Sequence, residues 1–62
     1  MKVIARQESM GAASKWFIYV PKLDATTATG HREDVERQAL VMIRELTGKS
    51  PRALRVEYVE EL

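Results

Sequence analysis

Apolar and polar residues alternate along the first part of the chain in the manner of β-strands. Residues 2–8 predict a first strand, in which β-branched Val3 and Ile4 point to opposite faces. Residues 16–20 predict a second strand. The small residues 9–14 lie between the two strands and predict the turn of an antiparallel hairpin.

The second strand is apolar on both faces. Trp16, Ile18 and Val20 point one way, whereas Phe17 and Tyr19 point the other. A strand with one solvated face alternates apolar with polar residues, which this strand does not do. Both faces of the predicted sheet therefore carry apolar side chains that have to be shielded from water.

The second strand ends at Pro21, which has no amide hydrogen to donate to a β-ladder and keeps the preceding residue extended. Residues 24–30 are rich in β-branched threonine and contain few large apolar side chains. This composition predicts a third strand that lies at an edge of the sheet.

Residues 31–48 predict an amphipathic helix. Its first turns are acidic, which suits the positive end of the helix dipole, and Glu33 and Arg37 have the spacing of an i, i+4 ion pair. Gly48 predicts a left-handed C-terminal cap. The apolar stripe of this helix comprises Val35, Ala39, Met42, Ile43 and Leu46.

Residues 52–60 are compatible with two structures. Leu54, Tyr58 and Leu62 fit a helical period, whereas Leu54, Val56 and Tyr58 also fit the alternation of a strand. The β-branched and aromatic residues and the glutamates at the end of the chain favour the strand. The predicted order is strand, strand, strand, helix, strand, with one helix covering one face of the sheet.

A chain of this size predicts one domain, residues 1–62, of marginal stability. Folding buries about 6,200 Å² of surface, and at ~25 cal/mol/Å² its apolar part contributes on the order of 90 kcal/mol. Ordering the chain at ~1.5 kcal/mol per residue costs about the same. Small domains in this position gain stability from disulfides, metals or a partner subunit, and the chain has no cysteine and one histidine. Association with another chain, as a homodimer, is therefore predicted.

The charge and hydropathy of the chain limit the classes of partner that it is expected to bind. Ten basic and nine acidic residues give a net charge of +1, and they alternate along the chain without forming a basic run. Nucleic-acid binding is therefore not favoured. No apolar run is long enough to span a membrane, and Arg6 and Glu8 interrupt the segment that a signal peptide requires. A cytoplasmic protein is expected.

No group of residues predicts catalysis, a cofactor or a metal site. "GKS" at residues 48–50 resembles the end of a phosphate-binding loop, but the glycine that such a loop needs five positions earlier is Ile43. His31 has no cysteine or second histidine beside it, so a surface or capping role is favoured. The acidic residues Glu33, Asp34 and Glu36 are explained by the helix dipole.

The candidate site is therefore a surface. Phe17 and Tyr19 lie on the strand face turned away from the predicted helix, and Ile4 of the neighbouring strand extends them into an apolar patch of the kind found at interfaces. The predicted core comprises Trp16, Ile18, Val20, Val35, Ala39, Met42, Ile43, Leu46, Leu54 and Val56.

Two segments together resemble the N-terminal domain of HicB-like antitoxins. "WFIYVPKL" (16–23) is an aromatic-rich strand that ends in Val-Pro-x-Leu, and "TTATGHREDVERQALVMI" (26–43) adds a threonine-glycine turn and an amphipathic helix. The likeness covers nearly the whole chain. The matching residues are Trp16, Ile18, Val20, Pro21, Leu23, Thr27 or Thr29, Gly30, Val35 and Ala39.

The resemblance implies an α+β, truncated ribonuclease-H-like fold: a three-stranded meander, a helix on one face, and a last strand parallel to the first. It does not imply nuclease chemistry, because the predicted strands offer only scattered acids such as Glu8 and Glu57. HicB-like antitoxins bind a small RNA-cleaving toxin, and many carry a second, DNA-binding domain. No separate DNA-binding domain is expected in this chain.

The sequence thus favours a non-enzymatic interaction module that self-associates or binds a toxin through the uncovered sheet face. The alternative is a small RNA-binding or single-strand-binding protein that uses the sheet as a stacking platform. In that case the aromatics stack on bases, and Arg6, Lys15 and Arg55 contact phosphates.

Overall fold

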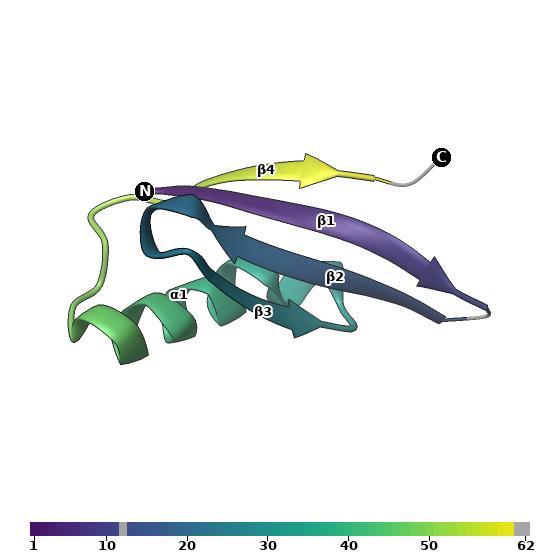
Figure 1. Ribbon diagram of the computed structural model, residues 1–62, viewed down its shortest axis with the longest axis horizontal. Coiled ribbons are helices and arrows are strands. Elements are labelled where there is room, and N and C mark those ends of the chain that lie inside the picture. Colours follow the sequence, from purple (N-terminus) through teal and green to yellow (C-terminus); the bar gives the residue numbers. More distant parts are fainter. Residues whose placement is uncertain (12, 61–62) are drawn as a thin grey trace.

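The computed structural model describes residues 1–11 and 13–60, with the backbone alone described for Met10. The described chain is a small α+β domain with the predicted order β-β-β-α-β, and short 3₁₀ turns precede β3 and α1. The elements are β1 (Lys2–Met10), β2 (Ala13–Val20), β3 (Ala25–Thr29), α1 (Val35–Thr47) and β4 (Arg55–Val59) (Figure 1).

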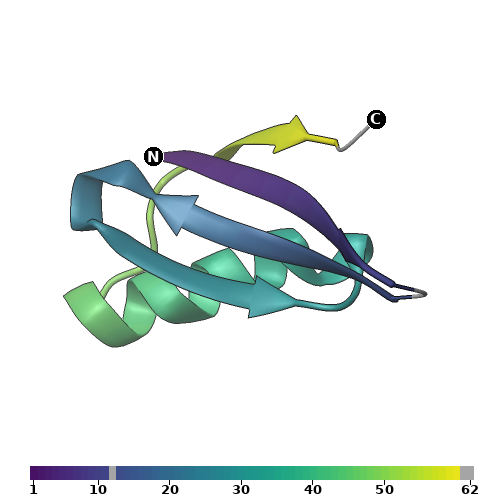
Figure 2. The same cartoon turned by 45° about the vertical axis from the view of Figure 1, so that its right-hand side comes forward.

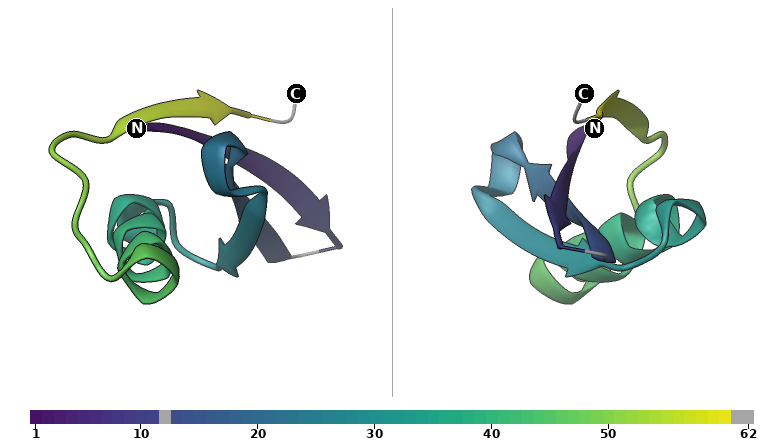
Figure 3. Two further views of the ribbon diagram at one scale, coloured as in Figure 1. Left: turned by 60° about the vertical axis from the view of Figure 1, so that its left-hand side comes forward. Right: turned by 90° about the vertical axis from the view of Figure 1, so that its right-hand side faces the viewer.

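The strands form one mixed sheet in the order β3-β2-β1-β4. β1 and β2 are antiparallel, as are β2 and β3, whereas β4 is parallel to β1. α1 supplies the crossover connection that a parallel pair requires. Figures 2 and 3 show the helix on one side of the sheet, nearest to β2 and β3, and no helix on the other side.

The β1–β2 hairpin is longer than the sequence predicted. Its register pairs Met10 with Ala13, so the strands continue into the segment 9–14 that was predicted as a turn. Gly11 has φ = 67°, a left-handed conformation that suits a tight hairpin turn, and Ala12 lies outside the described residues. A tight turn lets the small residues beside it continue the ladder despite their weak β-propensity.

The chain turns between β2 and β3, as the position of Pro21 predicted. Pro21 is the first residue of a 3₁₀ turn, Pro21–Leu23, and the amide of Asp24 donates to the Pro21 carbonyl at 3.1 Å. β3 then covers Ala25–Thr29, one residue shorter at each end than predicted. The difference at its start arises because Asp24 adopts φ = 47° and is part of the turn.

α1 begins four residues later than predicted. Residues 32–34 form a 3₁₀ turn, in which the amide of Asp34 donates to the His31 carbonyl at 3.0 Å. The guanidinium of Arg37 pairs with Asp34 at 2.7 Å, so the predicted Glu33–Arg37 pair is wrong. At the other end Gly48 is left-handed (φ = 75°) and donates its amide to Arg44, which confirms the predicted cap.

The C-terminal segment is a strand. β4 pairs with β1 in a register that sets Val56 beside Val3 and Tyr58 beside Ala5, so Val56 and Tyr58 face α1. Leu62, on which the helical alternative depended, lies outside the described residues.

The core lies between α1 and the sheet. Its buried members are Val3, Ala5, Trp16, Ile18, Val20, Val35, Ala39 and Ile43. Half-buried apolar side chains packed against it are Met1, Leu23, Met42, Leu54, Val56 and Tyr58. Tyr58 meets the ring of Trp16 edge-on at 5.7 Å, and the guanidinium of Arg32 lies 4.2 Å from the Tyr58 ring centroid.

Leu46 corrects the predicted core, because it is 59% exposed. It lies on the sheet-facing stripe of α1, but the last turn of the helix extends past the ends of the strands (Figure 1). Val3 and Ala5 were not among the predicted core residues, although both are fully buried. Three successive apolar residues, 3–5, hide the alternation that would have indicated which of them face α1.

Candidate functional site

Among the described residues, one face of the sheet carries no helix (Figures 1 and 3). The register sets Ile4 directly beside Tyr19 and Arg6 beside Phe17, and directly paired residues point to the same side of a sheet. The structure therefore brings Ile4, Phe17 and Tyr19 together on this face, which we call the open face. Its members are Lys2, Ile4, Arg6, Glu8, Lys15, Phe17, Tyr19, Thr26, Ala28, Arg55, Glu57 and Val59.

The centre of the open face is apolar. Ile4, Phe17 and Tyr19 are each half-buried, because their neighbours on the sheet cover part of each side chain. Ala28 of β3 lies beside Phe17, and Val59 of β4, which is 43% exposed, lies beside Arg6. The apolar positions thus extend over all four strands.

Charged residues surround this centre. Lys2 Nζ lies 3.7 Å from Glu57 Oε2, and both side chains are solvent-exposed, so this pair is of little energetic weight. Lys15 Nζ lies 6.0 Å from the ring centroid of Phe17. The basic members of the face are Lys2, Arg6, Lys15 and Arg55, and its acidic members are Glu8 and Glu57.

The side chain of Tyr19 is anchored by its hydroxyl. Its hydroxyl donates a 3.0 Å hydrogen bond to Asp24 Oδ1. This bond to a carboxylate, more than the slight burial and the negative charge beside it, raises the pKa of Tyr19 above 10.0 because it favours the protonated phenol. Asp24 lies in the turn that joins β2 to β3, so the bond ties the ring to the backbone of the turn.

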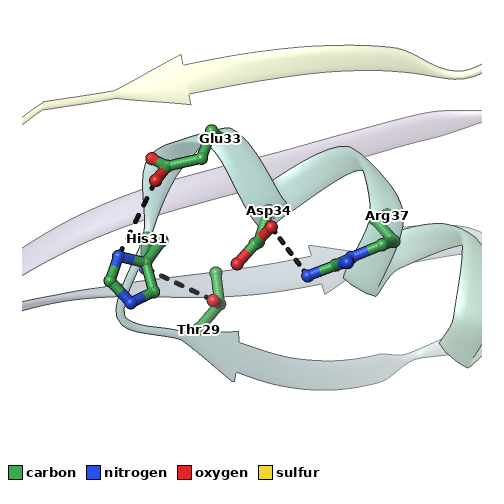
Figure 4. A network of polar contacts seen from close by, with 5 residues as sticks. All are labelled: Thr29, His31, Glu33, Asp34 and Arg37. Atoms are coloured by element: carbon green, nitrogen blue, oxygen red, sulfur yellow. Dashed lines mark hydrogen bonds and ion pairs between the residues drawn. The ribbon is translucent and has the colours of Figure 1, made fainter.

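His31 lies at the start of the helical segment, and its side chain is exposed. Figure 4 shows its ring beside Glu33, with His31 Nδ1 3.8 Å from Glu33 Oε1, and its backbone amide donating to Thr29 Oγ1 at 3.3 Å. Arg37 extends towards Asp34 and pairs with it. These contacts agree with the predicted surface position of His31.

The other sequence motifs are structural in the described part of the chain. Gly48 of "GKS" caps α1, and the hydroxyl of Thr47 donates to the Ile43 carbonyl at 2.8 Å. Within residues 1–11 and 13–60 no three histidine or acidic side chains cluster in a way that would hold a metal ion. In the same residues no helix is long and apolar enough to cross a membrane.

Two apolar members of the open face were not among the predicted site residues. Val59 alternates with Val56 and Tyr58, so a strand in residues 52–60 already implied that it points away from the helix. No sequence pattern indicated that Ala28 belongs to the open face, because its place beside Phe17 depends on the β2–β3 register.

Comparison of this chain with models of protein families, with curated proteins and with solved structures finds no match.

Proposed function

We propose that this chain is a non-enzymatic, cytoplasmic protein-interaction module that resembles the toxin-neutralising domain of a HicB-like antitoxin. In this proposal the open face associates with a second copy of the chain. The small RNA-cleaving toxin that the resemblance implies is the protein that the assembled module neutralises.

The observation that carries the proposal is the apolar centre of the open face. Ile4, Phe17 and Tyr19 come from two neighbouring strands and form one patch, to which Val59 adds an exposed apolar side chain. Contiguous apolar side chains with a polar rim are typical of protein interfaces. The charged residues around this patch supply such a rim.

The chain is less compact than a typical monomer of its size, which also supports the presence of an association surface. Its accessible surface is 4590 Å², whereas a compact monomer of 7.1 kDa exposes about 4,100 Å². Its radius of gyration is 11.5 Å, against about 10.6 Å for a compact domain of this length.

The charges on the open face suit a contact between two copies. Four basic and two acidic side chains lie on one surface, so a two-fold axis can bring Glu8 or Glu57 of one copy to basic residues of the other. A surface of a single sign would repel its own copy.

The proposal is tested with Phe17→Lys and Tyr19→Lys combined in one variant. Lysines at the centre of the open face would be buried without partners in the complex, so the variant should have half the mass of the wild type by light scattering. Circular dichroism should show an unchanged helix signal, because neither residue belongs to the core between α1 and the sheet. Leu46→Lys, which charges an exposed apolar residue of α1, is the matched control and should keep the wild-type mass.

Equal masses for the wild type and the double variant would reject the open face as the association surface. Titration with single-stranded RNA at two salt concentrations tests the other class of partner. Binding that falls steeply with salt and is lost in the double variant would replace the present proposal with nucleic-acid binding.

A further inference from the structure

The two edges of the sheet differ in chemistry. β4 carries exposed Arg55 and Glu57, and charges on an edge strand oppose pairing with another chain. β3 consists of three threonines and two alanines, without charge, proline or glycine. In the described part of the chain β3 pairs only with β2, so its outer edge is uncovered. Apart from its short length, β3 therefore lacks the features that normally protect an edge.

The sequence of β3 is complementary to itself. An antiparallel pair of two β3 strands about a two-fold axis through Thr27 sets Thr27 opposite Thr27, Thr26 opposite Ala28, and Ala25 opposite Thr29. All five residues pair, no large side chains collide, and threonine pairs are favourable across strands. This register also keeps Ala25, Thr27 and Thr29 of both copies on the helix side, so each open face stays on the opposite side.

A surface of α1 adjoins the same edge. A shallow groove beside β3 is lined by Thr26, Thr27, Gln38, Val41, Met42 and Glu45. Val41 is apolar and 42% exposed, and it is not among the side chains that pack against the core. The two-fold axis through Thr27 passes next to this groove, so the grooves of two copies would face each other and cover both Val41 side chains.

We propose that β3 pairs with β3 of a second copy, which joins two sheets into one of eight strands. The partner is the same chain because the edge matches its own sequence and carries no charge that would select another protein. An interface of this kind is isologous: each copy presents the same residues to the other.

Combined with the proposed function, this contact defines the assembly. The two-fold axis of the edge contact runs perpendicular to the sheet, whereas that of a contact between open faces lies parallel to the sheets. Two perpendicular two-fold axes that intersect generate a closed tetramer. Two eight-stranded sheets would then meet through their open faces, with the helices outside. The edge contact itself does not depend on the open face.

The test uses charge pairs at Thr27. Thr27→Glu places two carboxylates opposite each other at the axis, close to Glu45 of both copies, so the edge contact should be lost. The wild type should then be a tetramer and Thr27→Glu a dimer by light scattering. Mixing Thr27→Glu with Thr27→Lys in equal amounts should restore the tetramer, because opposite charges then face each other.

Further variants separate the two contacts. Phe17→Lys with Tyr19→Lys should leave an edge-paired dimer, and adding Thr27→Glu to it should give a monomer. A wild-type dimer that Thr27→Glu leaves intact, and that the open-face variant splits, would overturn the edge contact and keep the proposed function. A wild-type dimer that the open-face variant leaves intact, and that Thr27→Glu splits, would reject the open face as an association surface and keep the edge contact.

Val41→Lys is a second probe of the edge contact, because the exposed position of Val41 tolerates lysine in the folded chain. It should weaken the same contact as Thr27→Glu, whereas Leu46→Lys, outside the groove, should not. Unchanged assembly in both Thr27→Glu and Val41→Lys would overturn the proposal.

Discussion

The hydroxyl of Tyr19 and the carboxylate of Asp24 form the contact that joins the open face to the turn after β2. Asp24 adopts φ = 47°, a region that non-glycine residues seldom occupy, although aspartate is among those that tolerate it. The 3.0 Å bond from Tyr19 holds this conformation. This bond thus connects an aromatic ring on the open face to a turn residue that its own amide also ties to the Pro21 carbonyl.

Tyr19→Phe should lower the urea midpoint of unfolding at pH 8, because it removes this bond. The pKa of Tyr19 is raised on folding, so the stabilisation is complete below pH 10 and is lost as the pH rises through the pKa of the folded state. The difference between wild type and Tyr19→Phe should therefore shrink above pH 10. Asp24→Asn should move the pKa of Tyr19, followed by absorbance, back towards 10. Equal midpoints at pH 8 would contradict this role of the bond.

At the scale of elements, the ends of α1 are determined by local chemistry. Acidic residues precede its first turn, and Gly48 ends it in a left-handed conformation that places its amide 2.8 Å from the Arg44 carbonyl. The hydroxyl of Thr47 donates a hydrogen bond to the Ile43 carbonyl and accepts one from the backbone amide of Lys49. Residues 48–54 then connect the capped helix to β4.

Gly48→Ala should destabilise the protein by about 1 kcal/mol, because a Cβ is strained at φ = 75°. Gly30→Ala is the matched control: an added Cβ there meets no neighbouring atom and the backbone is not left-handed, so stability should be almost unchanged. Chemical denaturation followed by circular dichroism measures both. A similar loss in the two variants would show that the cap conformation is not the cause.

At the scale of the whole molecule, one helix and one sheet enclose a small core. Ile18, at the centre of β2, has no exposed surface, whereas Leu46 at the end of α1 is 59% exposed. In a chain of this size, single core residues account for a large share of the few kcal/mol of net stability. The open face adds apolar surface that residues 1–11 and 13–60 do not cover.

Ile18→Ala should cost about 2–5 kcal/mol, which is close to the whole stability of so small a domain, and should leave much of the protein unfolded. Leu46→Ala should change stability by less than about 0.5 kcal/mol, because its side chain is already largely in water. Thermal unfolding of both variants distinguishes the two positions. A large loss in Leu46→Ala would mean that the end of α1 packs more closely than its exposure indicates.

The sequence by itself determined the first three strands, the helix and the two faces of β2, and for residues 52–60 it favoured a strand over a helix. These properties depend on local spacing: alternation places Phe17 and Tyr19 opposite Trp16, Ile18 and Val20, and the helical period gives the stripe of α1. Proline and glycine mark the ends of these elements, because their backbone restrictions act within a few residues. The membership of Ile4 in the open face did not follow from alternation, because residues 3–5 are all apolar and only the β1–β2 register assigns them to a face.

Only the tertiary structure decided how these elements meet. The β1–β2 register sets Ile4 beside Tyr19, and the β2–β3 register sets Ala28 beside Phe17. Because α1 extends past the ends of the strands, Leu46 is exposed to water, although the helical period places it on the core-facing stripe. The strand order makes β3 an uncovered edge beside Val41. Each of these depends on contacts between residues distant in sequence, which no local period contains.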